Sequence, residues 1–331
     1  MLRNAARQTV SAILRFIPSP LAELARTRFI RSANGSLAHR ILYRVIYVLR
    51  YRGVPKKLAS FALLDNPGVR LNNADSFIVE WLYWFGERYG YEAAEIAWWK
   101  LFVARSTGVL DLGANIGYYP LQAATVSNSV PYTAVEPHPG SAGALRRNLA
   151  LNSISNVTVV EGAAVPGVPD GPVELRLPIT RDHYAEAPTG AFVNADGSIP
   201  DIGLGQFKYT TVSVEAFELR RLLTPQTDLI KIDVEGQEFL LLSAIADHIS
   251  VTRPTLFLEM LDGADQLRDW VRDVLLPLGY RCYVPVGDSL DELSSESLTG
   301  SSVGSRNDSR DVILTCLDVS QWRLPMAWAS N

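Results

Sequence analysis

The sequence predicts an α/β fold with a mostly parallel sheet, helices on both faces of that sheet, and a helical extension at the N-terminus. Two observations support this prediction. From Thr107 onward, short apolar runs alternate with segments of helical periodicity, which is typical of parallel strands joined by helices. The first apolar run, 109–112, leads through a glycine-containing turn into a helical segment, the order found in strand–loop–helix nucleotide sites.

The elements follow in chain order from hydrophobic periodicity. Predicted strands cover 109–112, 132–136, 157–160, 228–234, 255–259, 280–286 and 312–317, and predicted helices cover 119–127, 141–152, 235–246 and 264–276. We expect the last two strands to form an antiparallel pair at the sheet edge. An insertion over 166–212 carries strand patterns at 173–177 and 209–214, and the Ser-rich stretch 288–310 is predicted to be a flexible loop. The expected domains are therefore 1–75, a basic amphipathic helical extension, and 76–331.

The aromatic-rich stretch 76–102 fits one or two helices broken near Gly86 and Gly90. Such aromatic side chains can stack on a sugar or a base, but they more often belong to a hydrophobic core. We expect core packing here.

Charge is distributed unevenly along the 331 residues. Residues 1–57 contain twelve Lys/Arg and one acid, Glu23, whereas the remainder contains 19 basic and 34 acidic residues. A basic amphipathic helix at 2–17 indicates either peripheral contact with an anionic membrane surface through residues 1–57 or a helical cover packed on the acidic domain. Two cysteines favour a reducing, cytoplasmic compartment. If residues 1–57 contact a membrane, we expect peripheral attachment at its inner face.

No metal site is expected, because the four histidines are scattered without the spacing of metal ligands.

The loop after the first strand reads Asp-Leu-Gly-Ala-Asn-Ile-Gly from Asp111 to Gly117. A dinucleotide loop has the spacing Gly-x-Gly-x-x-Gly and presents N–H groups to a pyrophosphate. Here the spacing is Gly-x-x-x-Gly, and Asp111 would repel a pyrophosphate but attract an ammonium and a sulfonium. This argues for S-adenosylmethionine as the cofactor and against a dehydrogenase.

The next two strands support that cofactor. Glu136 ends the second strand about 20 residues after the loop, where a carboxylate can accept both hydroxyls of a ribose. The alternative is that Glu136 only caps a turn before Pro137. The third strand and its end, 157–163, are expected beside the adenine.

Three segments together resemble the FkbM family of S-adenosylmethionine-dependent methyltransferases: VLDLGANIGYY at 109–119, VEPHP at 135–139 and LIKIDVEGQE at 229–238. The pair Tyr91-Glu92 also looks like that family's pattern, whereas Glu215 stands where family members more often have Asp. The resemblance covers roughly 90–259 and implies a class I methyltransferase fold, a Rossmann-like seven-stranded sheet. It implies that Asp111, Gly113, Asn115 and Gly117 hold the methionine portion, with Glu136 on the ribose and Glu161 to Ala163 near the adenine.

Candidate catalytic residues follow the fourth strand. Alternation places Lys231, Asp233 and Glu235 on one side of that strand, at the end where ligands bind in open α/β sheets. Asp233 is the first candidate for the base or a cofactor contact, and Glu235 is the second, although Glu235 could simply cap the next helix. Lys231 would need a carboxylate partner, either Asp233 or Asp111.

Two further candidates are weaker. Glu259 could close the acceptor site or satisfy Lys231, and the loop residue His183 is a weak candidate for a base.

The predicted function is O-methylation of a hydroxyl on a small molecule or glycan, such as a sugar, glycolipid or polyketide-type metabolite. One alternative is a nucleic-acid (RNA) methyltransferase. It is disfavoured because Asp-Val-Glu-Gly replaces the Asn/Asp-Pro-Pro-aromatic tetrad and because the domain is acidic, so we expect no nucleic-acid partner. The other alternative is a protein that binds S-adenosylmethionine without catalysis.

Overall fold

The computed structural model describes residues 18–179, 186–188, 190–193, 208–261, 263–298 and 311–325. The predicted helix at 2–17, the candidate base His183 and residues 194–207 therefore lie outside the described residues.

An eight-stranded sheet forms the centre of the protein, in the order β14-β13-β15-β12-β11-β3-β4-β5. Five neighbouring strands of this sheet run parallel: β12, β11, β3, β4 and β5. Strands β13, β14 and β15 pair antiparallel with their neighbours. Their bounds are β3 Val109–Leu112, β4 Tyr132–Glu136, β5 Val157–Glu161, β11 Leu229–Ile232, β12 Thr255–Glu259, β13 Arg281–Val286, β14 Ser289–Leu293 and β15 Asp311–Thr315. The predicted fold class is confirmed, with one strand more than the seven expected.

The additional strand, β14, lies within the stretch predicted to be a flexible loop. A two-residue turn at Gly287 and Asp288 joins it to β13, and Gly287 adopts φ +59°. Such tight turns with a positive-φ glycine close hairpins readily, so the chain folds back and adds one strand to the edge. A short 3₁₀ helix, Ser295–Leu298, follows.

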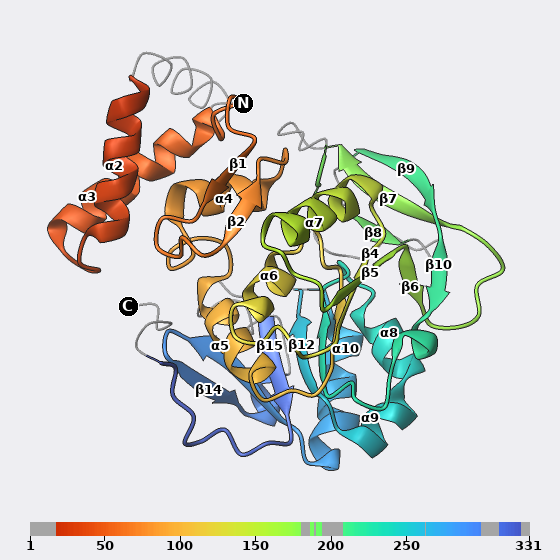
Figure 1. Ribbon diagram of the computed structural model, residues 1–331. Coiled ribbons are helices and arrows are strands. Elements are labelled where there is room, and N and C mark those ends of the chain that lie inside the picture. Colours follow the sequence, from red (N-terminus) through yellow and green to blue (C-terminus); the bar gives the residue numbers. More distant parts are fainter. Residues whose placement is uncertain are drawn as a thin grey trace.

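Helices cover both faces of this sheet (Figure 1). One face packs against α5 (Ala93–Val103), α6 (Tyr118–Ala124) and α7 (Pro139–Leu151), and the opposite face packs against α8 (Glu238–Ala244), α9 (Ala246–Thr252) and α10 (Asp265–Trp270). Alternate residues of β3 and β11 enter the two cores: Val109 and Leu229 face the first, Leu110 and Ile230 the second. Because both faces are covered, these strands are apolar almost throughout.

The insertion forms a small sheet of its own, in the order β8-β7-β9. Its strands are β7 Val173–Ile179, β8 Phe192–Val193 and β9 Lys208–Val214, and β7 pairs antiparallel with β9, as the two strand patterns predict. A short parallel pair, β6 Ala163–Val165 and β10 Ala216–Glu218, connects the insertion to the end of β5.

The N-terminal part consists of α2 (Ser19–Arg31), α3 (Leu37–Leu49), the hairpin β1 (Ser60–Ala62) and β2 (Arg70–Asn72), and α4 (Phe77–Phe85). Phe29 of α2 is fully buried and meets Phe85 of α4 edge to face, with ring centroids 5.7 Å apart. The aromatic-rich stretch 76–102 forms α4 and α5 and is mainly core, as expected, with Trp98 and Trp99 almost fully buried.

Candidate active site

A cavity opens at the carboxyl ends of β3, β4 and β11, next to the point where the strand order reverses direction. Residues from all three strand ends line it, together with Tyr91, Tyr119 and the insertion residues Pro188, Gly190, Ala191 and Val193. Ligands bind at this position in open α/β sheets because the loops there diverge and leave a crevice. The cavity is therefore the candidate active site.

The glycine loop between β3 and α6 forms one wall. Gly113 adopts φ +84°, and a Cβ atom at this position would lie 1.9 Å from the carbonyl oxygen of Asp233. No residue with a side chain fits such an approach, so the glycine allows the ends of β3 and β11 to come together. Gly117 begins α6 at φ +82°, packed against Leu145, and does not line the cavity.

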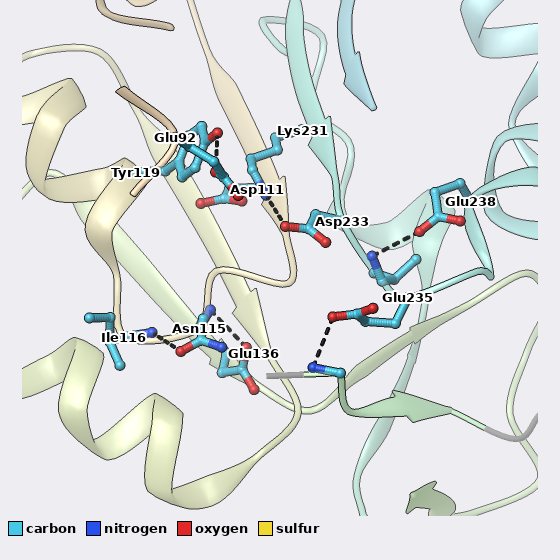
Figure 2. Close-up of polar contacts among 12 residues, drawn as sticks. Glu92, Asp111, Asn115, Ile116, Tyr119, Glu136, Lys231, Asp233, Glu235 and Glu238 are labelled. Atoms are coloured by element: carbon cyan, nitrogen blue, oxygen red, sulfur yellow. Dashed lines mark hydrogen bonds and ion pairs between the residues drawn. The ribbon is translucent and has the colours of Figure 1, made fainter. Parts of the chain in front are cut away.

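Glu136 lies at the end of β4 and joins the cavity to the glycine loop (Figure 2). Its Oε2 accepts a hydrogen bond of 2.8 Å from the backbone N–H of Asn115, and its Oε1 accepts one of 2.8 Å from the N–H of His138. Burial raises the pKa of Glu136 to about 7, although these two N–H donors oppose the rise. Glu136 thus holds the turn before Pro137, which was the alternative role considered from the sequence. It also lines the cavity.

Asp111 does not line the cavity, although it was predicted to contact the cofactor. It is fully buried, and its Oδ2 accepts a 2.7 Å hydrogen bond from the hydroxyl of Tyr132. Burial raises its pKa to about 6, opposed by the charge of Lys231 and by the Tyr132 hydrogen bond. The carboxylate lies behind the glycine loop, on the side of Lys231 (Figure 2).

The other residues predicted to contact the cofactor also fall into two groups, those that line the cavity and those that do not. Gly113, Asn115 and Ala163 line the cavity, as Asp233 does. Glu161 lies outside it and forms an ion pair with Arg146, with 39% of its side chain exposed. Of the residues predicted near the adenine, Ala163 thus lines the cavity, beside its neighbour Ala164, and the Glu161 side chain does not.

Lys231 and Asp233 form the ion pair that the sequence analysis required for a buried lysine. Nζ of Lys231 lies 2.9 Å from Oδ2 of Asp233, and both side chains line the cavity. Nζ also lies 4.5 Å from the centre of the Tyr119 ring. Burial alone would lower the pKa of Lys231, but the carboxylates of Asp233, Asp111 and Glu92 raise it, so the side chain is an ammonium and not a base.

Glu92 is a site residue that the sequence analysis named only as part of a pattern. Its Oε2 accepts a 2.7 Å hydrogen bond from the hydroxyl of Tyr119, and burial raises its pKa to about 7 against the opposing charge of Lys231. Its backbone is left-handed at φ +48°, just before α5. Tyr91 and Tyr119 were not predicted as site residues, and both line the cavity. The pair Tyr91-Glu92 was the available signal.

Glu235 was weighed as a cavity residue or as a helix cap, and the N-cap residue of α8 is Gln237. Glu238 accepts hydrogen bonds of 3.1 Å from the backbone N–H groups of Val234 and Gly236 and starts α8. Glu235 instead lines the cavity, where its Oε1 accepts a 2.9 Å hydrogen bond from the N–H of Gly190 (Figure 2). It thereby connects the β11 loop to the insertion.

This region is rich in carboxyl groups, and burial raises the pKa values of several of them. Carboxylates of Glu92, Asp111, Asp233, Glu235, Glu259 and Asp311 act on one another or on Lys231 across the ends of β3, β11, β12 and β15. One ammonium does not balance them. An arrangement of this kind attracts cationic groups and can accept a proton from a weak acid.

Comparison with solved structures gives matches of low identity. A methyltransferase FkbM from Methylobacillus flagellatus is 16% identical, with 63% of this chain and 43% of that chain covered and a TM-score of 0.38. A putative O-methyltransferase from Klebsiella pneumoniae is 13% identical (68% and 80% covered, TM-score 0.38). An O-methyltransferase from Bacillus cereus in complex with SAH is 10% identical (67% and 79% covered, TM-score 0.35). This chain thus spans less than half of the Methylobacillus protein.

No curated protein matches the chain. The methyltransferase FkbM domain matches it over residues 111–282, which is more than half of its 331 residues and includes β3, the glycine loop, Glu136 and the β11 loop. The chain therefore belongs to the FkbM family of methyltransferases.

Proposed function

We propose that this protein is an S-adenosylmethionine-dependent O-methyltransferase that acts on a hydroxyl of a sugar, glycolipid or polyketide-type metabolite. The observation that carries the proposal is the carboxylate-rich cavity at the ends of β3, β4 and β11, with Glu136 on one wall and the Lys231–Asp233 pair on another.

The residues present fit S-adenosylmethionine. Glu136 stands at the end of the second strand, where its carboxylate can accept hydrogen bonds from a ribose, and Ala163 and Ala164 offer an apolar surface to an adenine. The excess of carboxylates over ammonium groups suits a ligand with two positive centres, the ammonium and the sulfonium. Gly113 and Asn115 bring backbone close to that ligand.

When bound, S-adenosylmethionine supplies an electrophilic methyl group. The protein's part is to place a hydroxyl in line with that group and to remove its proton. Lys231 holds Oδ2 of Asp233, which leaves Oδ1 to accept a hydrogen bond from the hydroxyl. Tyr91 and Tyr119 narrow the same end of the cavity and help to exclude water. In this scheme Asp233 is the base and Lys231 orients it.

Calorimetric titration tests the cofactor first. Wild-type protein should bind S-adenosylmethionine and S-adenosylhomocysteine but not NAD, and Glu136→Ala should weaken both by at least about tenfold, since a charged hydrogen bond contributes about 1.5–3 kcal/mol. Glu161→Ala is the matched control, because Glu161 lies outside the cavity. Binding of NAD alone would refute the proposal.

Transfer of a labelled methyl group identifies the acceptor class. Hydroxylated glycosides, glycolipids and polyketides should accept label, and Asp233→Asn should reduce turnover by 10²–10⁴-fold, the usual contribution of a positioned base. Labelling of RNA instead would favour the nucleic-acid alternative. Tight cofactor binding with no acceptor from any class would favour a binding protein.

We also propose that α2 and α3 place the enzyme against an anionic lipid surface. Leu37, Ile41 and Val45 recur every four residues along α3 and are 66%, 54% and 40% exposed, with the exposed Arg40 and Arg44 beside them. An exposed apolar stripe flanked by arginines suits the boundary between headgroups and acyl chains. Among the described residues, every helix is too short or too polar to cross a bilayer.

Liposome flotation tests this second proposal with the full chain. The variant Ile41→Glu/Val45→Glu should float less with anionic vesicles than wild type, and neither should float with neutral vesicles. Ser294→Glu/Ser297→Glu, which follows β14 in the catalytic domain, is the control for added charge. Equal flotation of wild type and Ile41→Glu/Val45→Glu would contradict a role for this face.

A further inference from the structure

Three carboxylates meet at the ends of β11 and β12. Asp233 and Glu235 belong to the loop after β11, and Glu259 is the last residue of β12. Each offers an oxygen, and these oxygens lie within 4.8 Å of one another. Two ligands of one hard cation lie at most about 5 Å apart, twice the 2.3–2.6 Å of a calcium–oxygen bond, and closer for magnesium. The three side chains can therefore reach one ion with small adjustments.

Glu259 supplies a second, independent observation. Its Oε2 atom is shielded from solvent and accepts no hydrogen bond from any described residue. A buried carboxylate oxygen without a donor is costly, and native proteins usually satisfy such atoms with a hydrogen bond, water or an ion. Glu259 belongs to the three-carboxylate group, so a cation bound there would give this side chain a partner.

The surrounding charges favour a cation further. Asp311, a further acid, stands opposite Glu259 in the β12–β15 register. Lys231 pairs with Asp233, and among the described residues no cationic side chain pairs with Glu259.

We propose that Asp233, Glu235 and Glu259 bind a divalent cation, Mg²⁺ or Mn²⁺, that holds the acceptor hydroxyl. Three carboxylate oxygens suit these hard ions, whereas zinc prefers nitrogen and sulfur ligands. An octahedral ion would keep about three further positions for water or acceptor oxygens. That the ion holds the acceptor hydroxyl rests on the proposed methyl transfer. Binding of the ion by the three carboxylates does not depend on it.

A bound ion would change the chemistry of the acceptor in a defined way. An oxygen that coordinates Mg²⁺ or Mn²⁺ is polarised and loses its proton more easily than a free alcohol. Asp233 would then act through the ion in place of direct contact, because Lys231 already holds its Oδ2. This role goes beyond the sequence-based expectation of no metal site.

Binding of Mn²⁺ alone, without cofactor or acceptor, tests the site. Protein freed of metal by EDTA and dialysis is titrated with MnCl₂, and free Mn²⁺ is followed by electron paramagnetic resonance. We expect one site per chain, competition by Mg²⁺, and at least about tenfold weaker binding in Glu259→Gln and Asp233→Asn. Glu292→Gln, an exposed glutamate on β14, is the matched control and should bind like wild type.

Two readouts separate failure of the site from failure of the fold or of the proposed function. Glu259→Gln should keep the wild-type melting temperature and its affinity for S-adenosylhomocysteine. Absence of Mn²⁺ binding in wild type, or binding that neither variant weakens, would overturn the metal site while leaving the cofactor proposal intact. Mn²⁺ binding without any binding of S-adenosylhomocysteine would uphold the metal site and contradict the cofactor proposal.

Discussion

Lys231 and Asp233 are two residues apart in the chain and 2.9 Å apart between Nζ and Oδ2. Lys231 lies inside β11, where it is 3% exposed, and Asp233 lies just beyond the strand end. Lys231 is also the register partner of Asp111 on β3, so one ammonium serves acids on two strands. The site depends on this lysine for its charge balance.

Lys231→Met should destabilise the protein by about 3–5 kcal/mol at pH 8, because it leaves buried carboxylates without their counter-charge. The folded-state pKa values of Asp111 and Glu92, already about 6 and about 7, would rise further without the ammonium. Acids whose pKa is raised by folding destabilise the fold when ionised, so the loss should be smaller at pH 5.5. Urea unfolding at both pH values measures it. Lys57→Met, at an exposed position, should change little.

Glu136 should make cofactor affinity depend on pH. Its pKa of about 7 means that the carboxylate is largely ionised at pH 8 and largely protonated at pH 6. If the ribose binds the ionised form, the Kd for S-adenosylhomocysteine should rise by about tenfold from pH 8 to pH 6. Titration calorimetry on wild type and Glu136→Gln measures both slopes. A variant with the same slope as wild type would assign the effect to another group.

Gly113→Ala should unfold the protein or destabilise it by about 3 kcal/mol or more, because the new Cβ would lie 1.9 Å from the carbonyl oxygen of Asp233. Gly35→Ala is the matched control. Gly35 has a similar φ, +73°, with no atom within 4 Å of the added Cβ, so it should show only the backbone cost of about 1 kcal/mol. Thermal unfolding compares the two. Equal losses of stability would mean that the positive φ, and not the contact with Asp233, accounts for the cost at Gly113.

Asn148→Ala should cost about 2–4 kcal/mol and weaken cofactor binding. Asn148 is fully buried in α7, where its Oδ1 accepts hydrogen bonds from the backbone and side chain of Asn72, and its Nδ2 donates a 2.8 Å bond to the carbonyl of Ile116. It thus ties the β1–β2 hairpin to the glycine loop. Unfolding and calorimetry check both effects. Asn34→Ala, in an exposed turn, is the control.

The central strands were predictable because they are buried on both faces. The apolar runs at 109–112, 132–136 and 255–259 end at the same residues in β3, β4 and β12. Around β11 the prediction extended too far, to Val234, because periodicity does not register a change of backbone direction. The strand ends at Ile232, and Glu235 adopts φ +56° before α8 begins at Glu238. The loop conformation that Glu238 holds ends the strand there, although the residues have strand propensity.

Side-chain direction was harder to predict than secondary structure. Alternation places Asp111 on one face of β3, but it does not say that Tyr132 and Lys231 occupy the same face from neighbouring strands. The Glu92–Tyr119 contact and the three-carboxylate group likewise depend on pairings between residues far apart in the chain. Strand order decides these pairings, and a single sequence leaves them open.

The cavity has walls of two kinds. The sheet contributes Gly113, Glu136 and Asp233, which are fixed by strand register and buried hydrogen bonds. The opposite wall comes from the segment between β7 and β9, through Pro188, Gly190 and Val193. Glu235 joins the two walls through the backbone N–H of Gly190, so this link uses no side chain of the second wall. Substitutions in the second wall can therefore change which ligand binds. The chemistry stays unchanged as long as the residues of the first wall are kept.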